Sequence, residues 1–172
     1  MTFLNLAKKR YSVRHYTSQK VEIEKLEQIL AAAQAAPTAC NKQPVHMLII
    51  QEENCLQKLS KAANIFCAPL AILICADSSK AWTRPHDGKK TTDIDASILT
   101  DHMMLEAADL GLGSVWICNF KPDVVREEFC LPDNLEPINL LAIGYTDETP
   151  QSPDRHAKMR KPISEMISYE TM

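Results

Sequence analysis

The longest unbroken apolar run, from Leu70 to Ala76, does most to limit what this chain can fold into. Its length falls far short of the ~20 residues that a membrane-spanning helix requires. A short run of this kind, rich in Leu and Ile, predicts a strand, and the lack of alternation with polar residues predicts burial on both faces. The rest of the chain must therefore supply a covering layer on each side of a sheet.

Other segments provide the remaining strands and the covering helices. Pro37 ends a helix with apolar residues at helical spacing, and Gly111 suits the left-handed end of a long helix that Thr92 or Asp93 can cap. Helices alternating with apolar strands predict a sheet covered on both faces. The expected strands are 45–50, 70–76, 114–118 and 136–144, and the expected helices are 3–9, 21–36, 54–63, 92–111 and 122–129.

The C-terminal segment 150–172 is expected to form an extended arm. It contains prolines and is too polar to build a core by itself, yet it ends in apolar residues, Ile163, Met166, Ile167 and Tyr169. These side chains need a surface to dock on, either on the same domain or on a second copy of the chain. Residues 1–172 are otherwise expected to form one domain.

Composition narrows the class of protein. The balance of 19 Lys+Arg against 22 Asp+Glu gives a net charge of −3, which argues against a general nucleic-acid binder. The N-terminus lacks the apolar stretch of a signal peptide. None of the six cysteines forms a Cys-x-x-Cys pair, so neither zinc nor a disulfide framework is expected. We expect a reduced, soluble, cytoplasmic protein that does not associate with membranes.

Positive charge is concentrated at the two ends of the chain. Residues 1–20 contain five cations and no acid, and a second basic segment lies near the C-terminus. In an extended backbone Arg10, Ser12 and Arg14 point to one side, a donor surface suited to a phosphate. The two segments could converge on one anion; the alternative is an ordinary solvated surface.

The segment 36–44 is a second candidate site. It is a loop between two prolines that holds a hydroxyl, two amides and a cation, and amides suit the edge of a heterocycle because they both donate and accept. An ordinary turn is the alternative interpretation. Two other patterns do not indicate a site. Gly111-Leu112-Gly113 lies after a helix rather than after a strand, so it does not match a dinucleotide-binding fingerprint. The histidines are scattered along the chain and predict no metal site.

Taken in order, the motifs resemble the FMN-dependent nitroreductase family, and most of all its short, minimal members. They are Arg-x-Ser-x-Arg at 10–14, APTACNKQP at 36–44, DIDASILTDHMMLEAADLGLGSVWI at 93–117, LLAIGYTDETP at 140–150 and RKPISEMISYE at 160–170. The resemblance spans nearly the whole chain.

The resemblance implies an α+β fold with a mixed sheet between helices, in a homodimer whose C-terminal arms wrap the partner. It implies FMN at the dimer interface. Arg10 and Ser12, with Tyr11 between them, match the phosphate-binding positions, and Arg14 matches a position near the ribityl chain and the pyrimidine ring. Thr38, Asn41 and Gln43, which follow Pro37, match the loop lent by the neighbouring subunit. Backbone around Trp116 and Ile117 matches a segment along the flavin, and Arg160 with Lys161 matches a C-terminal basic pair.

The activity implied is ping-pong transfer of hydride from NADH or NADPH, through FMN, to nitroaromatics, quinones or similar electron-poor acceptors. No catalytic side chain is expected because the flavin carries the chemistry. The chain departs from the family in having Val45-His46-Met47 where an aromatic often follows Gln-Pro, and its one candidate lid is 82–90. Alternatives are a specialised flavoenzyme of the same fold, a non-catalytic flavin sensor or store, and a binding module for another phosphorylated ligand.

Overall fold

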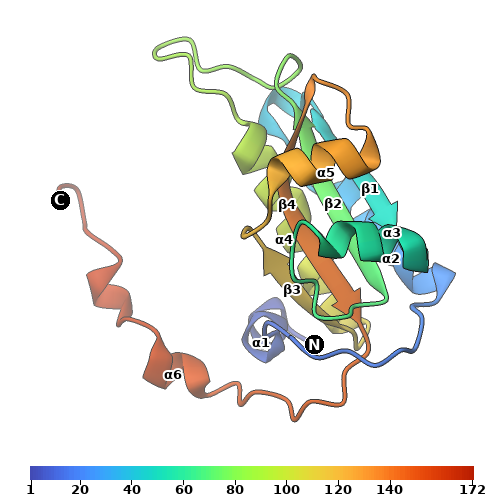
Figure 1. Cartoon of the computed structure of the whole chain (residues 1–172). Helices are drawn as coiled ribbons and strands as arrows, with labels where there is room; N and C mark the ends of the chain where they lie inside the picture. The colour runs from blue at the N-terminus through green and yellow to red at the C-terminus, as the bar shows by residue number, and fades with distance from the viewer.

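A computed structural model of residues 1–172 places a four-stranded sheet between two layers of helices (Figure 1). The strand order is β1-β2-β4-β3, and all three pairings are antiparallel. The strands are β1 (Val45–Ile50), β2 (Leu70–Asp77), β3 (Gly113–Ile117) and β4 (Leu135–Gly144). The main helices are α1 (Phe3–Lys9), α2 (Ile23–Ala35), α3 (Glu53–Ser60), α4 (Thr92–Asp109) and α5 (Pro122–Phe129).

Strand β2 is the centre of the molecule. All eight of its residues are buried, and Leu73 pairs with Leu48 of β1 on one side and with Leu140 of β4 on the other. Its side chains alternate between two cores: Leu73 contributes to the core on one face and Ile72 to the core on the other. The apolar run that limits the fold is therefore a strand buried on both faces, as predicted.

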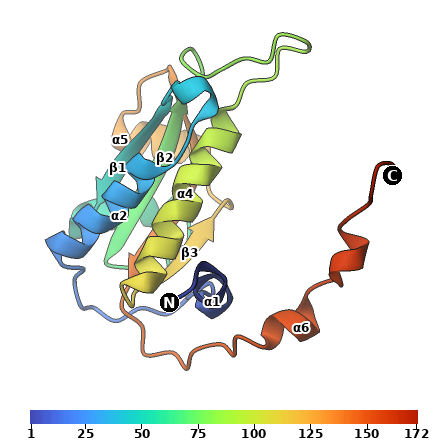
Figure 2. The same cartoon turned by 180° about the vertical axis from the view of Figure 1, so that it is seen from behind.

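The two helical layers differ. Figure 1 shows α3 and α5 in front of the sheet, and Figure 2, from behind, shows α2 and α4 on the opposite face. The core beneath α3 and α5 includes Leu56, Leu59 and Val125, and the core beneath α2 and α4 includes Ile29 and Met103. Short α1 lies against α4 near the free edge of β3.

The expected α+β class is confirmed, and the expected helices and strands all form, with ends displaced by at most three residues. The mixed character of the sheet is confined to one parallel bridge, in which Ser12 pairs with Ser114 of edge strand β3. The N-cap position of α4 is Thr91 rather than Thr92 or Asp93, and its side chain makes no capping hydrogen bond. Its C-terminal end is as predicted: Gly111 has a φ of +79°, and the Leu112 N–H donates to the Ala107 carbonyl at 2.8 Å.

The arm leaves the layered body beyond Pro150 and runs away from it (Figure 1). It contains two short helical segments that were not expected, α6 (Arg155–Met159) and the 3₁₀ turn Ile163–Glu165, and every residue from Ala157 onward is exposed. None of the helices in the molecule is both long enough and apolar enough to cross a membrane.

Candidate functional site

The segment after α1 is fixed along the edge of the sheet. Ser12 bridges to Ser114, and the Val13 N–H donates to the Ser114 carbonyl at 3.0 Å. The Val13 side chain is only 1% exposed and lies in the core beneath α3 and α5. Because Val13 points inward from an extended backbone, Ser12 and Arg14 on either side of it are directed away from that core.

A basic cavity of about 460 Å³ lies between this segment and the arm. Four arginines and a histidine contribute to its wall, and no carboxylate does. The two basic ends of the chain therefore converge, which is one of the two alternatives that the charge distribution leaves open. The lining residues are Arg10, Tyr11, Ser12, Arg14, Gln151, Arg155, His156, Met159 and Arg160.

Arg155 ties the arm to the end of α1. Its guanidinium donates to the Lys8 carbonyl at 3.0 Å and to the Arg10 carbonyl, and the ring of His156 lies 3.2 Å from the same Lys8 carbonyl. A cation at the C-terminal end of a helix satisfies free carbonyls and complements the helix dipole. These contacts hold α6, and with it Arg160, beside Arg10.

The cation cluster is electrostatically strained. Burial lowers the pKa of Arg10, the neighbouring Arg155 lowers it further, and Arg160 adds to the effect; Asp101 on α4 opposes these influences. None of the ion pairs in the structure involves Arg10, Arg14, Arg155 or Arg160. Half-buried positive charge without a matching carboxylate is the electrostatic signature of an anion-binding site.

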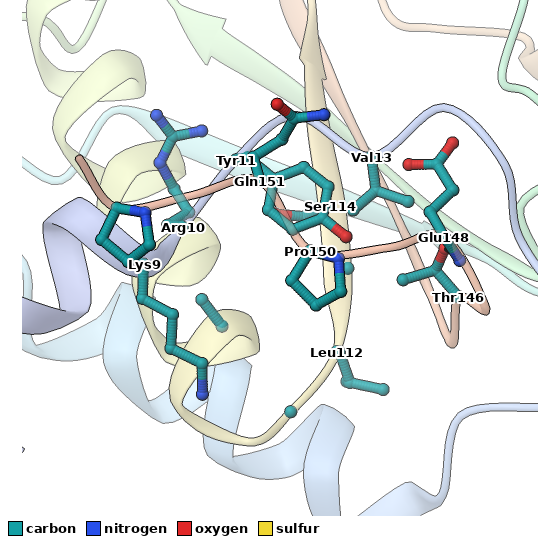
Figure 3. Close-up of a pocket in the computed structure, with 14 residues that line it drawn as sticks. Lys9, Arg10, Tyr11, Val13, Leu112, Ser114, Thr146, Glu148, Pro150 and Gln151 are labelled. Atoms are coloured by element: carbon teal, nitrogen blue, oxygen red, sulfur yellow. Dashed lines mark hydrogen bonds between the residues drawn. The ribbon is translucent and has the colours of Figure 1, made fainter. Parts of the chain in front are cut away.

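A second cavity of about 280 Å³ adjoins the first and shares Arg10, Tyr11 and Gln151 with it (Figure 3). It lies between the turn after α4 and the start of the arm. Ser114 is among the residues that line this cavity and is 2% exposed, and its buried hydroxyl has no hydrogen-bond partner. Figure 3 shows it beside Tyr11, with Pro150 of the arm across the space. A buried hydroxyl without a partner is costly, so the cavity offers a polar contact to an occupant.

The 36–44 loop lies elsewhere, beside the N-terminal end of α4. The Ala39 N–H donates to Asp95, in the first turn of α4, at 2.9 Å, whereas Ala108 near the other end of that helix lines the cavity of Figure 3. At about 1.5 Å of rise per residue, the two positions are ~20 Å apart along the helix. Pro37, Thr38, Asn41 and Gln43 therefore do not join the arginine cluster within one chain.

The other predicted site residues are distributed along β3 and the arm. Trp116 faces the α2 and α4 layer, and its indole N–H is buried without a partner. Ile117 is buried on the opposite face, so it can offer a ligand backbone rather than side chain. Lys161 is exposed and lies outside the lining of the basic cavity.

Comparison with known proteins shows to which protein family the chain belongs. The sequence model of the nitroreductase family matches residues 7–67 and 57–145, which together make up most of the chain. The chain belongs to the nitroreductase family. A crystal structure of a nitroreductase family protein from Clostridium difficile 630 is 62% identical, covers 100% of both chains and has a TM-score of 0.98.

Two further members of the family carry names that state a cofactor. An FMN-dependent nitroreductase from Clostridium difficile R20291 is 28% identical, with 99% of this chain and 100% of that one covered and a TM-score of 0.80. A Bacillus subtilis relative named as an FMN reductase using NAD(P)H is 30% identical over 92% of this chain and 69% of its own length.

Sequence reasoning missed four functional candidates in this nitroreductase-family chain, three of them on α6. Arg155, His156 and Met159 line the basic cavity because 155–159 is helical, so Arg155 and Met159, four residues apart, share a side. The arm is expected to be extended here, and in an extended chain residues four apart lie farther from each other than on adjacent turns of a helix. Asp95 was also missed, although it interrupts the apolar face of a predicted helix. No group of three or more His, Cys, Asp or Glu side chains is arranged to hold a metal ion.

Proposed function

We propose that this nitroreductase-family chain is an FMN-dependent oxidoreductase that takes hydride from NAD(P)H and delivers it to nitroaromatics, quinones or similar electron-poor acceptors. The observation that carries the proposal is the cavity lined by Arg10, Arg14, Arg155 and Arg160 with no carboxylate in its wall. The names of two relatives, an FMN reductase and an FMN-dependent nitroreductase, support the choice of cofactor.

The residues present fit an FMN phosphate. A phosphate monoester carries nearly two negative charges near pH 7, and arginine forks bind such groups with paired hydrogen bonds. Burial and the neighbouring Arg155 lower the pKa of Arg10, and this supports the proposal because a bound anion would stabilise the positive charge there. We infer that Arg10, Ser12 and Arg160 hold the phosphate, with Tyr11, Arg14 and Lys161 close by.

We also propose that the functional unit is a homodimer in which the arm of each chain docks on the other. Helix α4 leaves Ile94, Ile98 and Leu105 exposed or half-exposed, and their spacings of four and seven residues place them on one side of the helix as an apolar stripe. The arm exposes Met159, Ile163, Met166, Ile167 and Tyr169. Apolar surface of this extent is typical of an interface.

A dimer would also bring the two halves of the predicted site together. The arginine cluster and the Pro37–Gln43 loop lie at opposite ends of α4 in one chain, so a second copy running antiparallel along α4 would place its loop beside the first copy's arginines. In this arrangement Thr38, Asn41 and Gln43 offer hydroxyl and amide groups to the edge of the flavin ring, and backbone near Trp116 and Ile117 borders it. Residues 1–172 would act as one FMN-binding domain, with 150–172 as the exchanged arm.

The chain's own residues bind and orient; when bound, FMN supplies the hydride chemistry. The arginines hold the phosphate, which fixes the depth of the cofactor in the cavity. The loop amides set the orientation of its ring. The NAD(P)H nicotinamide and the acceptor would use the same open position in turn, which is a ping-pong scheme, and no side chain is assigned as acid, base or nucleophile.

An absorbance spectrum of the purified full-length protein, recorded before and after anaerobic addition of NADH or NADPH, tests the proposal. A flavin spectrum that bleaches with either nucleotide, and recovers on addition of a quinone, supports it. A flavin spectrum that neither nucleotide bleaches would favour a sensor or store. A colourless protein that also fails to bind added FMN would favour a different phosphorylated ligand.

A further inference from the structure

The Asp95 carboxylate is buried at the N-terminal end of α4 without a cationic partner. Its side chain is 0% exposed, Oδ1 accepts the Ala39 N–H at 2.9 Å, and Oδ2 accepts the Thr91 hydroxyl at 2.9 Å. None of the ion pairs in the structure includes it. A buried carboxyl group needs hydrogen-bond donors, and here two neutral donors and the positive end of the helix dipole surround it. A residue of this kind calls for a role beyond filling the core.

Asp95 is the anchor of a strained loop. Cys40, Asn41 and Gln43 all have positive φ, near +50°, a conformation that is unfavourable for residues with a side chain. Within the loop, the Gln43 N–H donates to the Thr38 hydroxyl at 3.1 Å and the Lys42 N–H to the Ala39 carbonyl at 3.1 Å. These bonds shape the loop, but they do not attach it to the rest of the molecule.

The loop is attached to the molecule at two points. The Asp77 N–H donates to the Pro44 carbonyl at 2.8 Å where β1 begins, and Asp95 accepts the Ala39 N–H. The side chains of Asn41 and Gln43 lie between these points and are exposed. The Asn41 amide makes no hydrogen bond within the chain, so it is free to meet a ligand. The Gln43 amide donates to the Asn41 carbonyl at 3.2 Å, so the two residues are linked to each other. The Asp95 contact fixes the N-terminal side of this pair, and the Pro44 contact fixes the C-terminal side.

The same carboxylate reaches the 82–90 segment through Thr91. The Thr91 N–H donates to the Trp82 carbonyl at 3.1 Å, and Thr83 bridges to Lys90, so this segment closes into a hairpin whose base rests on Thr91. Figure 1 shows the hairpin projecting beyond the end of the sheet, near the start of α4. Asp95 thus connects the 36–44 loop with the candidate lid.

We propose that Asp95 is a positioning residue that holds the loop in the conformation in which Asn41 and Gln43 meet the flavin ring, whereas the arginine cluster binds the phosphate independently. The proposal rests on the proposed function. It separates two kinds of recognition in one site: an electrostatic one for phosphate and a hydrogen-bonded one for the ring, set by a carboxylate that itself touches no ligand.

The test compares Asp95→Ala with Asp93→Ala in the full-length protein. Asp93 lies in the same first turn of α4 but is exposed, so it is a matched control for the helix dipole. Each variant is titrated with FMN and with riboflavin, which lacks the phosphate, by quenching of flavin fluorescence. Asp95→Ala should weaken the binding of both flavins by the same factor, about tenfold, which corresponds to the loss of one hydrogen bond. Asp93→Ala should change neither.

Limited trypsin digestion supplies a second readout that does not depend on flavin. Lys42 lies exposed in the loop and should be cut faster in Asp95→Ala than in Asp93→Ala, because the loop has lost its anchor. If Asp95→Ala does not fold by circular dichroism, Asp95→Leu replaces it, because leucine branches at Cγ as aspartate does and has no acceptor for the Ala39 N–H.

The outcomes separate the two proposals. Unchanged flavin affinity in a folded variant would overturn the positioning role, and so would loss of FMN affinity with riboflavin affinity unchanged, because Asp95 would then act at the phosphate. Failure of the unmodified protein to bind either flavin would overturn the proposed function instead. In that case faster cleavage at Lys42 would still report on the anchor itself.

Discussion

Replacing Gly113 by alanine should displace Val13 and, with it, the neighbouring residues that line the basic cavity. Gly113 is the first residue of β3, and a Cβ added there would lie 2.7 Å from Val13 Cγ2 and 3.0 Å from Val13 Cβ. Carbon atoms prefer about 3.5–4.0 Å, so one of the two segments must move by roughly 1 Å. Because Gly113 does not have a positive φ, the effect is steric rather than conformational.

The magnitude follows from overpacking. Inserting a methyl group into a filled core costs about 1–3 kcal/mol of unfolding free energy, and for a chain of this length each kcal/mol lowers Tm by roughly 2–4 °C. Val13 is buried and hydrogen-bonded to Ser114, so it fixes the position of the segment. A shift of Val13 would therefore carry its chain neighbours Ser12 and Arg14 with it. FMN affinity should therefore fall along with stability.

Urea unfolding followed by circular dichroism, paired with FMN titration, measures both effects, and Val13→Ala is the partner substitution. Alone, Val13→Ala removes two buried methyl groups and should cost about 2 kcal/mol. With Gly113→Ala it also relieves the clash, so the double variant should be more stable than the sum of the two losses predicts, by about 1 kcal/mol or more. Strict additivity, or a Gly113→Ala protein as stable as the unmodified one, would refute the steric argument.

Three further perturbations test the site, the assembly and the core. Arg10→Ala should weaken FMN binding about tenfold or more and leave riboflavin binding nearly unchanged, because a charged hydrogen bond to the phosphate is lost. Lys8→Ala is the control in the same fluorescence titration, since Lys8 is exposed and lies outside both cavities. Equal effects of the two substitutions would remove Arg10 from the phosphate site. Ile94→Glu on α4, and truncation before Arg160, should each shift the protein from dimer to monomer in light scattering, and a dimer that persists in both would contradict the interface. Burial raises the pKa of Cys75 from 9.0 to about 11, so the unfolded chain loses this proton at a lower pH than the folded chain does. The free energy of unfolding should therefore fall above about pH 9, by up to about 1.4 kcal/mol per pH unit. Cys75→Ala should flatten that part of the pH profile.

The sequence predicts well those features that depend on local pattern. Leu70–Ala76 had to be a strand buried on both faces because nothing in it could face water. The arginines at the two ends of this acidic chain have few acids nearby, a pattern that fits either convergence on one anion or a solvated surface. Both predictions rest on residue type along the chain, and neither needs knowledge of a distant contact.

Features that depend on tertiary contacts were not predictable in this way. The bond from Asp95 to Ala39 joins residues 56 positions apart, and Arg155 reaches a carbonyl 145 positions away. Cys40 and Gln43 adopt positive φ although backbone preference at such positions favours glycine. Helix α6 has five residues flanked by prolines, too short for periodicity to reveal. In each case the surrounding structure overrides the local preference.

The separation of the arginine cluster and the 36–44 loop along α4 has a genetic consequence. In the proposed dimer each site takes its cations from one chain and its loop from the other. A chain defective at Arg10 and a chain defective at Asp95 would each be weak as homodimers. Mixed together, they would form a heterodimer in which one site inherits both defects and the other inherits none. Two weakened alleles expressed in one cell should therefore complement each other, because each heterodimer would contain one intact site, about half the sites of the unmodified dimer.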